Sequence, residues 1–172
     1  FPVKTVYPYN IPVFQNTPEI EFKSTVTFLI GENGAGKSTL LKAIAQRCGI
    51  HIWQNDFRVR IEPNPHEADL YKSLLAEWNT TPVKGSFFSA QIFNHFAQNL
   101  EEWAVKDPNM LEYFGGKSLI TQSHGQSLMA FFESRFNIKG IYFMDEPETA
   151  LSPTSLVRLV NLLNRFNREG EA

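Results

Sequence analysis

The chain has 172 residues and a net charge of −2, with 42% hydrophobic and 13% aromatic residues. This composition is enough for one compact domain with a core, and it excludes a chain that is disordered throughout. The charge is not the strongly basic balance of a protein that grips phosphate backbones, so nucleic acid is not indicated as a partner.

Cellular setting is constrained by two further features of the sequence. No apolar run approaches the roughly 20 residues that a membrane-spanning helix needs, and the first residues lack the order of a signal peptide. The single cysteine, Cys48, cannot form an intrachain disulfide and is interpreted as a buried thiol in a predicted helix. We therefore expect a cytoplasmic protein whose residues 1–172 form one domain.

The first half of the chain predicts strands followed by a helix. Residues 1–30 favour short strands, and the last of these, TVTFLI at 25–30, is a continuous apolar run typical of a buried strand. Residues 37–49 have apolar side chains at helical spacing and end on a glycine. Residues 51–63 alternate in polarity and predict a hairpin, and Pro65 opens a helix predicted to reach Trp78.

The second half alternates short strands with helices, which favours an α/β fold. Strands are expected at 85–88 and 140–146, and helices at 91–104 and 152–166. The aromatic side chains of 91–104 are interpreted as core rather than as a binding site. In the last helix, the side chains expected to face inward are Leu156, Leu159, Val160, Leu163 and Phe166.

Residues 31–39, GENGAGKST, fit the phosphate-binding pattern G-x-x-x-x-G-K-[ST] between a predicted strand and a predicted helix. In such a P-loop, glycines let backbone N–H groups converge on phosphate, and the helix N-terminus adds its dipole. We expect Lys37 to neutralise the β and γ phosphates and Ser38 to ligate Mg²⁺. The predicted nucleotide-binding residues are Gly31, Asn33, Gly34, Ala35, Gly36, Lys37, Ser38 and Thr39. Residues 115–118, GGKS, lack the first glycine of the pattern and are predicted to be a turn.

An apolar strand carries Asp145 and Glu146 to its carboxyl end, which is where an open parallel sheet binds ligands. Asp145 is expected to reach Mg²⁺ through its water shell. Glu146 is expected to accept a proton from the attacking water or to orient it. Two solvated acids before a proline turn would explain this pair if it stood alone, but beside a P-loop the pair favours nucleotide hydrolysis.

Residues 121–127, TQSHGQS, contain no aliphatic side chain. Ser123, Gly125 and Gln126 match the L-S-G-G-Q signature of the ABC-type ATPases, whereas Gln122 and His124 depart from it. The chain therefore resembles this family. In the family the loop opens a helix whose N-terminus faces the γ-phosphate of nucleotide held by a second subunit, so the resemblance implies that role for the three matching residues.

The resemblance covers nearly the whole chain and, more narrowly, points to small stand-alone bacterial predicted ATPases of the AAA family. Gln91 stands where the family keeps a glutamine that senses Mg²⁺ and the attacking water, and residues 148–153 look like the loop that crosses to the other subunit. The implied fold is a P-loop NTPase of the ABC type. It has a mainly parallel sheet, an N-terminal antiparallel β part and a helical insertion between the P-loop and the signature loop.

The family places another strand and then a γ-phosphate-contacting histidine after the final helix. In this chain all four histidines, His51, His66, His95 and His124, precede the acid pair. We therefore expect the domain to be truncated before that strand and histidine.

The resemblance implies an ATPase that binds Mg·ATP and closes as a head-to-tail homodimer with two composite sites. Its expected catalytic residues are Glu146, Gln91 and Lys37, and its expected metal ligands are Ser38, Asp145 and Gln91. Two alternatives stay open: a nucleotide-gated dimerisation module with little turnover, and the energising subunit of a transporter. A serine–histidine hydrolase is disfavoured, because Ser123 and His124 are sequence neighbours and no orienting acid is identifiable.

Overall fold

The computed structural model describes residues 4–52, 64–79, 81–136 and 138–169. Within these ranges its sheet has two parallel strands, β1 (Gly85–Ser89) and β2 (Ile141–Asp145), which pair residue for residue along their length. The strands predicted at 85–88 and 140–146 are therefore confirmed. Because the strands are parallel, their carboxyl ends meet at one edge of the sheet.

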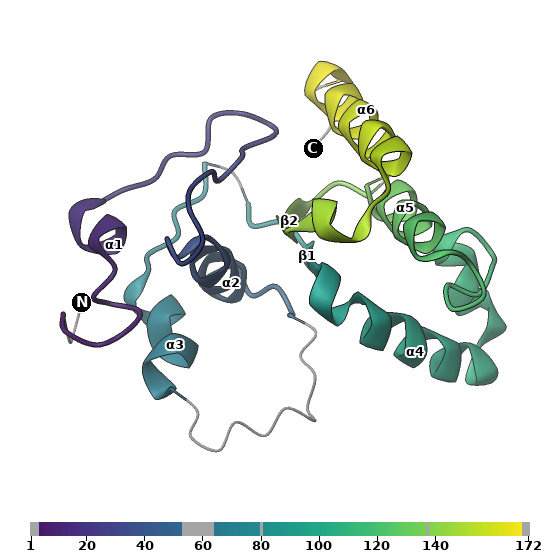
Figure 1. Cartoon of the computed structure of the whole chain (residues 1–172), viewed down its shortest axis with the longest axis horizontal. Helices are drawn as coiled ribbons and strands as arrows, with labels where there is room; N and C mark the ends of the chain where they lie inside the picture. Colours follow the sequence, from purple (N-terminus) through teal and green to yellow (C-terminus); the bar gives the residue numbers. More distant parts are fainter. Residues whose placement is uncertain (1–3, 53–63, 80, 137, 170–172) are drawn as a thin grey trace.

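The other elements are helical and lie on both sides of the sheet. Figure 1 shows α1, α2 and α3 on one side of the two strands and α4, α5 and α6 on the other. This arrangement confirms the mixed α/β class with a small parallel sheet. The α-helices are α1 (Pro12–Asn16), α2 (Lys37–Arg47), α3 (Pro65–Asp69), α4 (Ala90–Lys106), α5 (His124–Arg135) and α6 (Pro153–Glu169), and the 3₁₀ helices are η1 (Leu70–Ser73), η2 (Pro108–Phe114) and η3 (Pro147–Ala150).

Side chains alternate between the two faces along both strands. Phe87 and Phe143 belong to a buried cluster with Ala45 of α2. Phe88 belongs instead to a larger cluster with residues of α4, α5 and α6, in which its ring lies 4.7 Å from that of Phe132. The aromatic residues of α4 are part of this larger core, as the sequence predicted.

The first thirty residues differ from the sequence prediction. Described residues 4–30 contain α1 and no strand, so the expected antiparallel β part is not formed in this segment. The side chains of Phe28 and Ile30 are 70% and 93% exposed, which contradicts a buried strand at 25–30. Neither β1 nor β2 pairs with this segment, and an extended backbone without a neighbouring strand has no ladder hydrogen bonds to hold it.

Of three other predictions, two can be compared with the structure. The hairpin predicted at 51–63 falls largely on residues outside the described ranges. The helix predicted to reach Trp78 is shorter, because the chain becomes extended at Leu74 after η1. Residues 115–118 do form a turn, in which Gly115 and Gly116 both have positive φ after η2.

The final helix buries a narrower stripe than its sequence pattern predicted. Leu159 and Leu162 are buried, whereas Leu156 and Val160 are 37% and 46% exposed. The reason is that α6 packs chiefly against one neighbour, α5, so only the side chains directed at α5 are covered. The side chain of Phe166 lies outside the described part of the structure. No helix in the described ranges is long and apolar enough to cross a bilayer.

Candidate nucleotide-binding site

The loop before α2 turns into the helix through two glycines. Gly34 and Gly36 have φ values of 81° and 92°, in the left-handed region that residues with side chains rarely adopt. Gly36 is also the N-cap of α2, so the unpaired N–H groups of the first helical turn face the loop. The predicted residues from Gly31 to Thr39 therefore form one loop and helix start, an arrangement suited to phosphate.

Lys37 lies across this loop. Its ammonium Nζ donates hydrogen bonds to the carbonyl oxygens of Gly31 and Glu32, at 2.8 and 2.9 Å. A phosphate oxygen carries full negative charge and would be a stronger acceptor than either neutral carbonyl. Lys37 is therefore poised to exchange these internal contacts for phosphate contacts.

The P-loop meets the acid pair through Ser38 and Asp145. Ser38 Oγ donates to Asp145 Oδ1 at 2.7 Å, across 107 residues of sequence. The alternation of β2 explains this contact, because Asp145 shares the strand face of Phe143, which is the face covered by α2. The two oxygens are a donor set that fits Mg²⁺, which takes oxygen ligands and uses few protein groups besides phosphate and water.

The loop at 121–127 is bonded within itself. Ser123 is the N-cap of α5 and forms a capping box with Gln126, whose Oε1 accepts the Ser123 N–H at 3.3 Å. Ser127 Oγ also donates to the Ser123 carbonyl, at 3.3 Å. Local capping is therefore one physical reason for the polarity of this loop.

Upstream, the same loop closes on Ser118. The side chains of Thr121 and Gln122 both donate to the Ser118 carbonyl, at 3.1 and 3.2 Å. Gly125 faces the start of α6, where a Cβ at residue 125 would lie 3.2 Å from Ser155 Oγ. The glycine thus permits close packing of α5 on α6.

This loop does not lie beside the P-loop of the same chain. Helix α2 packs on β1, β2 and η1, whereas α5 packs on α6 and η2. In Figure 1 the two helices stand on opposite sides of the sheet. The structure therefore brings Ser38 and Asp145 together but keeps Ser123, Gly125 and Gln126 apart from them.

Similarity to known proteins is found around the P-loop and over most of the chain. Residues 9–49 match the family model described as an AAA domain. The chain is 27% identical over 158 residues to the ferric enterobactin transport ATP-binding protein FepC of Escherichia coli K12, covering 83% of this chain and 58% of that protein. It is 27% identical over 182 residues to the ribose import ATP-binding protein RbsA of Caldanaerobacter subterraneus, covering 95% of this chain and 36% of that protein. No solved structure matches the chain significantly.

These matches, an AAA domain at the P-loop and distant transport ATP-binding relatives over most of the chain, are to P-loop ATPases of the ABC type. The recognition drawn from its sequence motifs is therefore confirmed, and the family implies ATP as the ligand. A third relative, the ribose import ATP-binding protein RbsA 2 of Escherichia coli O157:H7, is 26% identical. The chain spans 58%, 36% and 31% of the lengths of the three relatives.

The two acids of the pair, Asp145 and Glu146, differ sharply in their surroundings. Asp145 is buried, whereas Glu146 directly after it is exposed and adopts φ 50° and ψ 50°. The carbonyl of Glu146 accepts hydrogen bonds from Oγ1 and N–H of Thr149, at 2.9 and 3.2 Å. From the sequence Thr149 was placed only within the loop at 148–153, because its contact with Glu146 depends on the turn that the chain makes after β2.

Gln91 is the second residue of α4, directly behind β1. Since Ser89 pairs with Asp145, α4 begins at the same sheet edge as the acid pair. The side chains of Gln91 and His124 lie outside the described part of the structure, which places only the backbone of these two residues.

The N-terminal segment of the chain also reaches the P-loop. The Tyr7 hydroxyl and Thr39 Oγ1 are 2.6 Å apart in a hydrogen bond, and Thr39 is buried. A Cβ at Gly36 would lie 3.0 Å from side-chain atoms of both Ile11 and Phe14. Sequence reasoning missed these contacts, because no local pattern links an aromatic segment to a loop some thirty residues further along.

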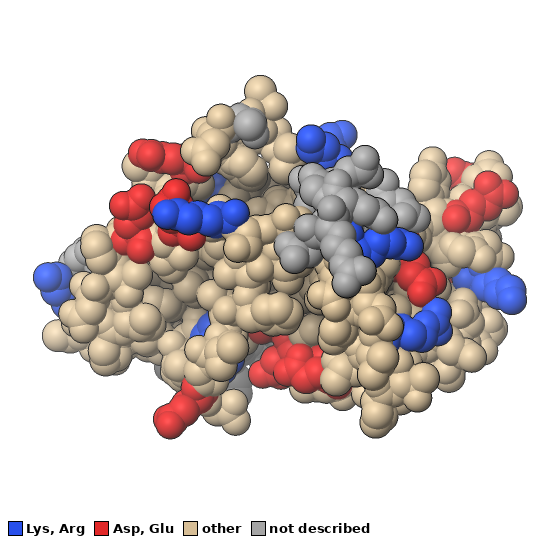
Figure 2. All heavy atoms as spheres, turned by 90° about the horizontal axis from the view of Figure 1, so that it is seen from above, with Lys and Arg blue, Asp and Glu red and all other residues tan. Residues whose placement is uncertain are grey.

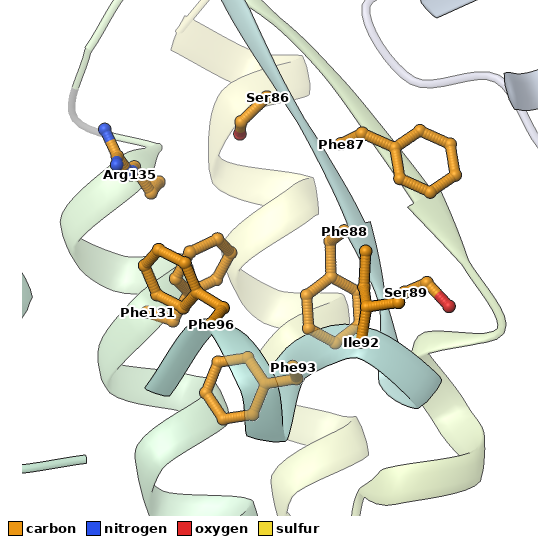
Figure 3. Close-up of a pocket in the computed structure, with 9 residues that line it drawn as sticks. All are labelled: Ser86, Phe87, Phe88, Ser89, Ile92, Phe93, Phe96, Phe131 and Arg135. Carbon is orange, nitrogen blue, oxygen red and sulfur yellow. The ribbon is translucent and has the colours of Figure 1, made fainter. Parts of the chain in front are cut away.

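A small cavity lies between β1, α4 and α5, and no P-loop residue lines it. Its volume is about 30 Å³, enough for a water molecule or two but not for a nucleotide. Figure 3 shows Phe88, Phe93, Phe96 and Phe131 gathered at this cavity, with Phe87 pointing to the other side of the strand. Arg135 lines one end, and burial lowers the pKa of its guanidinium.

The surface charges of the described residues are mixed (Figure 2). In the view of Figure 2, acidic and basic side chains alternate over the described surface without a continuous basic area. This distribution agrees with the net charge of −2 and gives no indication of a nucleic-acid-binding face on that side.

Proposed function

We propose that this domain binds Mg·ATP and hydrolyses it to ADP and phosphate. The observation that carries the proposal is the 2.7 Å hydrogen bond between Ser38 and Asp145, which joins the P-loop to the acid pair. Glu146 follows at the same edge of the sheet, so a phosphate binder and a candidate general base lie within one region of the fold.

In the proposed reaction, Lys37 exchanges its two carbonyl acceptors for the β and γ phosphates of ATP. Mg²⁺, when bound by Ser38 and by Asp145 through water, would offset further phosphate charge. Glu146 accepts a proton from water as the water oxygen bonds to the γ-phosphorus, and the bond from that phosphorus to the β–γ bridging oxygen breaks. Gln91 is proposed to orient the water.

We further propose a head-to-tail homodimer in the cytoplasm. In this dimer Ser123, Gly125 and Gln126 of one chain face the γ-phosphate held by the P-loop of the other. The separation of α5 from α2 in Figure 1 supports this arrangement, because the loop at 121–127 has no P-loop beside it in its own chain. The N-terminus of α5 offers N–H groups and a positive dipole to an anion.

Calorimetric ATP titration and phosphate release test the proposal with two variants. Lys37→Ala should weaken ATP binding by about 100-fold, or about 2.7 kcal/mol, since it removes the cation within the loop. Glu146→Gln should keep ATP affinity within about threefold and lower turnover by about 100-fold or more, because an amide accepts no proton. Lys42→Ala, an exposed lysine on α2, is the matched control.

Two results would contradict these assignments. Unchanged ATP affinity in Lys37→Ala would exclude the loop as the phosphate site. Turnover of Glu146→Gln at the parent rate would exclude Glu146 as the base. If the parent chain binds ATP and dimerises but releases no phosphate, a nucleotide-gated dimerisation module explains the site better than an ATPase does.

The names of the relatives favour one second candidate, the energising subunit of a transporter. FepC is named a transport ATP-binding protein and RbsA an import ATP-binding protein. If this chain has the same kind of role, affinity purification of the full-length protein should recover an integral membrane partner in an ATP-sensitive complex. Recovery of the ATPase alone from solubilised membranes would contradict that role.

A further inference from the structure

The backbone of Glu146 is unusual in the described part of the chain. Glu146 is the one residue there, other than glycine, with a positive φ. The left-handed conformation costs free energy for any residue with a side chain, so surrounding contacts must hold it. Continued strand geometry would send the side chain of residue 146 to the face opposite Asp145. The turn at Glu146 instead ends β2 and redirects the chain into η3.

The flanking residues constrain this turn from both sides. On the N-terminal side, Asp145 is fixed by Ser38 of the P-loop. On the C-terminal side, the ring of Pro147 disfavours the right-handed helical conformation for Glu146, which therefore does not join η3. Thr149 then donates both its Oγ1 hydroxyl and its N–H to the Glu146 carbonyl, at 2.9 and 3.2 Å.

We propose that Thr149 is a positioning residue, whose hydroxyl holds the backbone of Glu146 in the turn that presents its carboxylate for proton transfer. This inference rests on the proposed ATPase function. The backbone N–H bond is available from any residue except proline, so the specific contribution of threonine is the Oγ1 donor. Loss of that donor should disturb catalysis without disturbing the P-loop.

The test compares Thr149→Val with Thr149→Ser in the full-length protein. Valine keeps the shape and the N–H but lacks the hydroxyl, whereas serine keeps the hydroxyl. Thr149→Val should lower kcat on the order of 10- to 100-fold, because a base displaced by a fraction of an ångström loses its approach to water. The ATP dissociation constant should stay within about twofold, and Thr149→Ser should recover kcat to within about threefold of the parent. Thr81→Val, at an exposed threonine, controls for the substitution itself.

The outcomes separate this inference from the proposed function. A parent chain without turnover contradicts the ATPase proposal and the positioning role with it. If the parent chain hydrolyses ATP and Thr149→Val does so at the same rate, the positioning role of Thr149 is contradicted. The same holds if Thr149→Ser loses as much turnover as Thr149→Val. In both cases the ATPase proposal stands. A parallel loss of ATP affinity in Thr149→Val would identify a general structural effect and would also overturn the inference. Circular dichroism and a cooperative urea transition establish that each variant is folded.

Discussion

The P-loop region and the loop at 121–127 are built in opposite ways. The P-loop region is held by contacts between distant parts of the chain, such as Ser38 with Asp145 and Tyr7 with Thr39. The loop at 121–127 is held by hydrogen bonds between residues three to four positions apart, such as Ser123 with Gln126. The geometry of the P-loop region therefore depends on the folding of the chain as a whole. The second region is formed by local hydrogen bonds, and only in the proposed dimer would its helix N-terminus face the nucleotide of another chain.

The largest effect is expected from a mixture of two inactive variants. In the proposed dimer each site takes Lys37 from one chain and Ser123 from the other. Lys37→Ala loses the phosphate clamp, and Ser123→Arg places a bulky side chain where the partner's γ-phosphate approaches. A mixed dimer collects both changes in one site and leaves the other intact, so mixing should restore ATP-dependent association. Fluorescence transfer between differently labelled chains measures it.

If both variants are folded but their mixture stays monomeric with ATP, the proposed role of the loop at 121–127 in the site of the partner chain is contradicted. Association of either variant alone, at the parent ATP concentration, would also contradict it. Association is a better readout than ATP turnover for this mixture. If both sites of a dimer must be intact for hydrolysis, a mixed dimer with one intact site associates but hydrolyses ATP slowly.

The next effect tests how far the P-loop depends on distant packing. Gly36→Ala should lower the free energy of unfolding by about 2–4 kcal/mol, because its φ of 92° disfavours a side chain and the new Cβ would press on Ile11 and Phe14 at 3.0 Å. Gly49→Ala is the matched control: φ is 73° and nothing lies within 4 Å, so a loss of about 1 kcal/mol is expected. Urea unfolding measures both. Equal losses would show that α1 does not press on the loop.

A smaller effect is expected at the other long-range contact. Tyr7→Phe removes the hydroxyl that bonds Thr39 and should cost about 1 kcal/mol of unfolding free energy. Tyr113→Phe, at a tyrosine that is 67% exposed, should change stability by less than about 0.5 kcal/mol. If the two variants are equally stable, the N-terminal segment does not anchor the P-loop through Tyr7.

The smallest effect is expected within the loop at 121–127. Gln126→Ala removes half of the capping box and should cost about 0.5–1 kcal/mol in thermal or urea unfolding. ATP affinity of the isolated chain should stay within about twofold, since Gln126 is remote from its own P-loop. Gln98→Ala, at an exposed position of α4, serves as control. A large loss of ATP affinity in Gln126→Ala would show that the loop at 121–127 and the P-loop region of one chain are not independent.

Local patterns in the sequence were enough to predict several elements. The motif at 31–39, the helix behind it and the two short apolar strands at 85–88 and 140–146 each depend on spacing within a few residues, and each is found in the structure. The same holds for the turn at Gly115 and Gly116. The strand expected at 25–30 is not found. Backbone hydrogen bonding and side-chain periodicity are short-range, so a single sequence carries their signal directly.

Tertiary structure decided what the local pattern leaves open. An apolar run such as 25–30 becomes a strand only where another strand pairs with it, and the apolar stripe of α6 is buried only where α5 covers it. The contact of Ser38 with Asp145, the approach of Tyr7 to Thr39 and the left-handed turn at Glu146 all depend on the path of the chain through space. The sequence by itself predicted which residues would bind phosphate, and long-range packing determined which partners they meet in the fold, because contacts between distant residues leave no periodic signal in the chain.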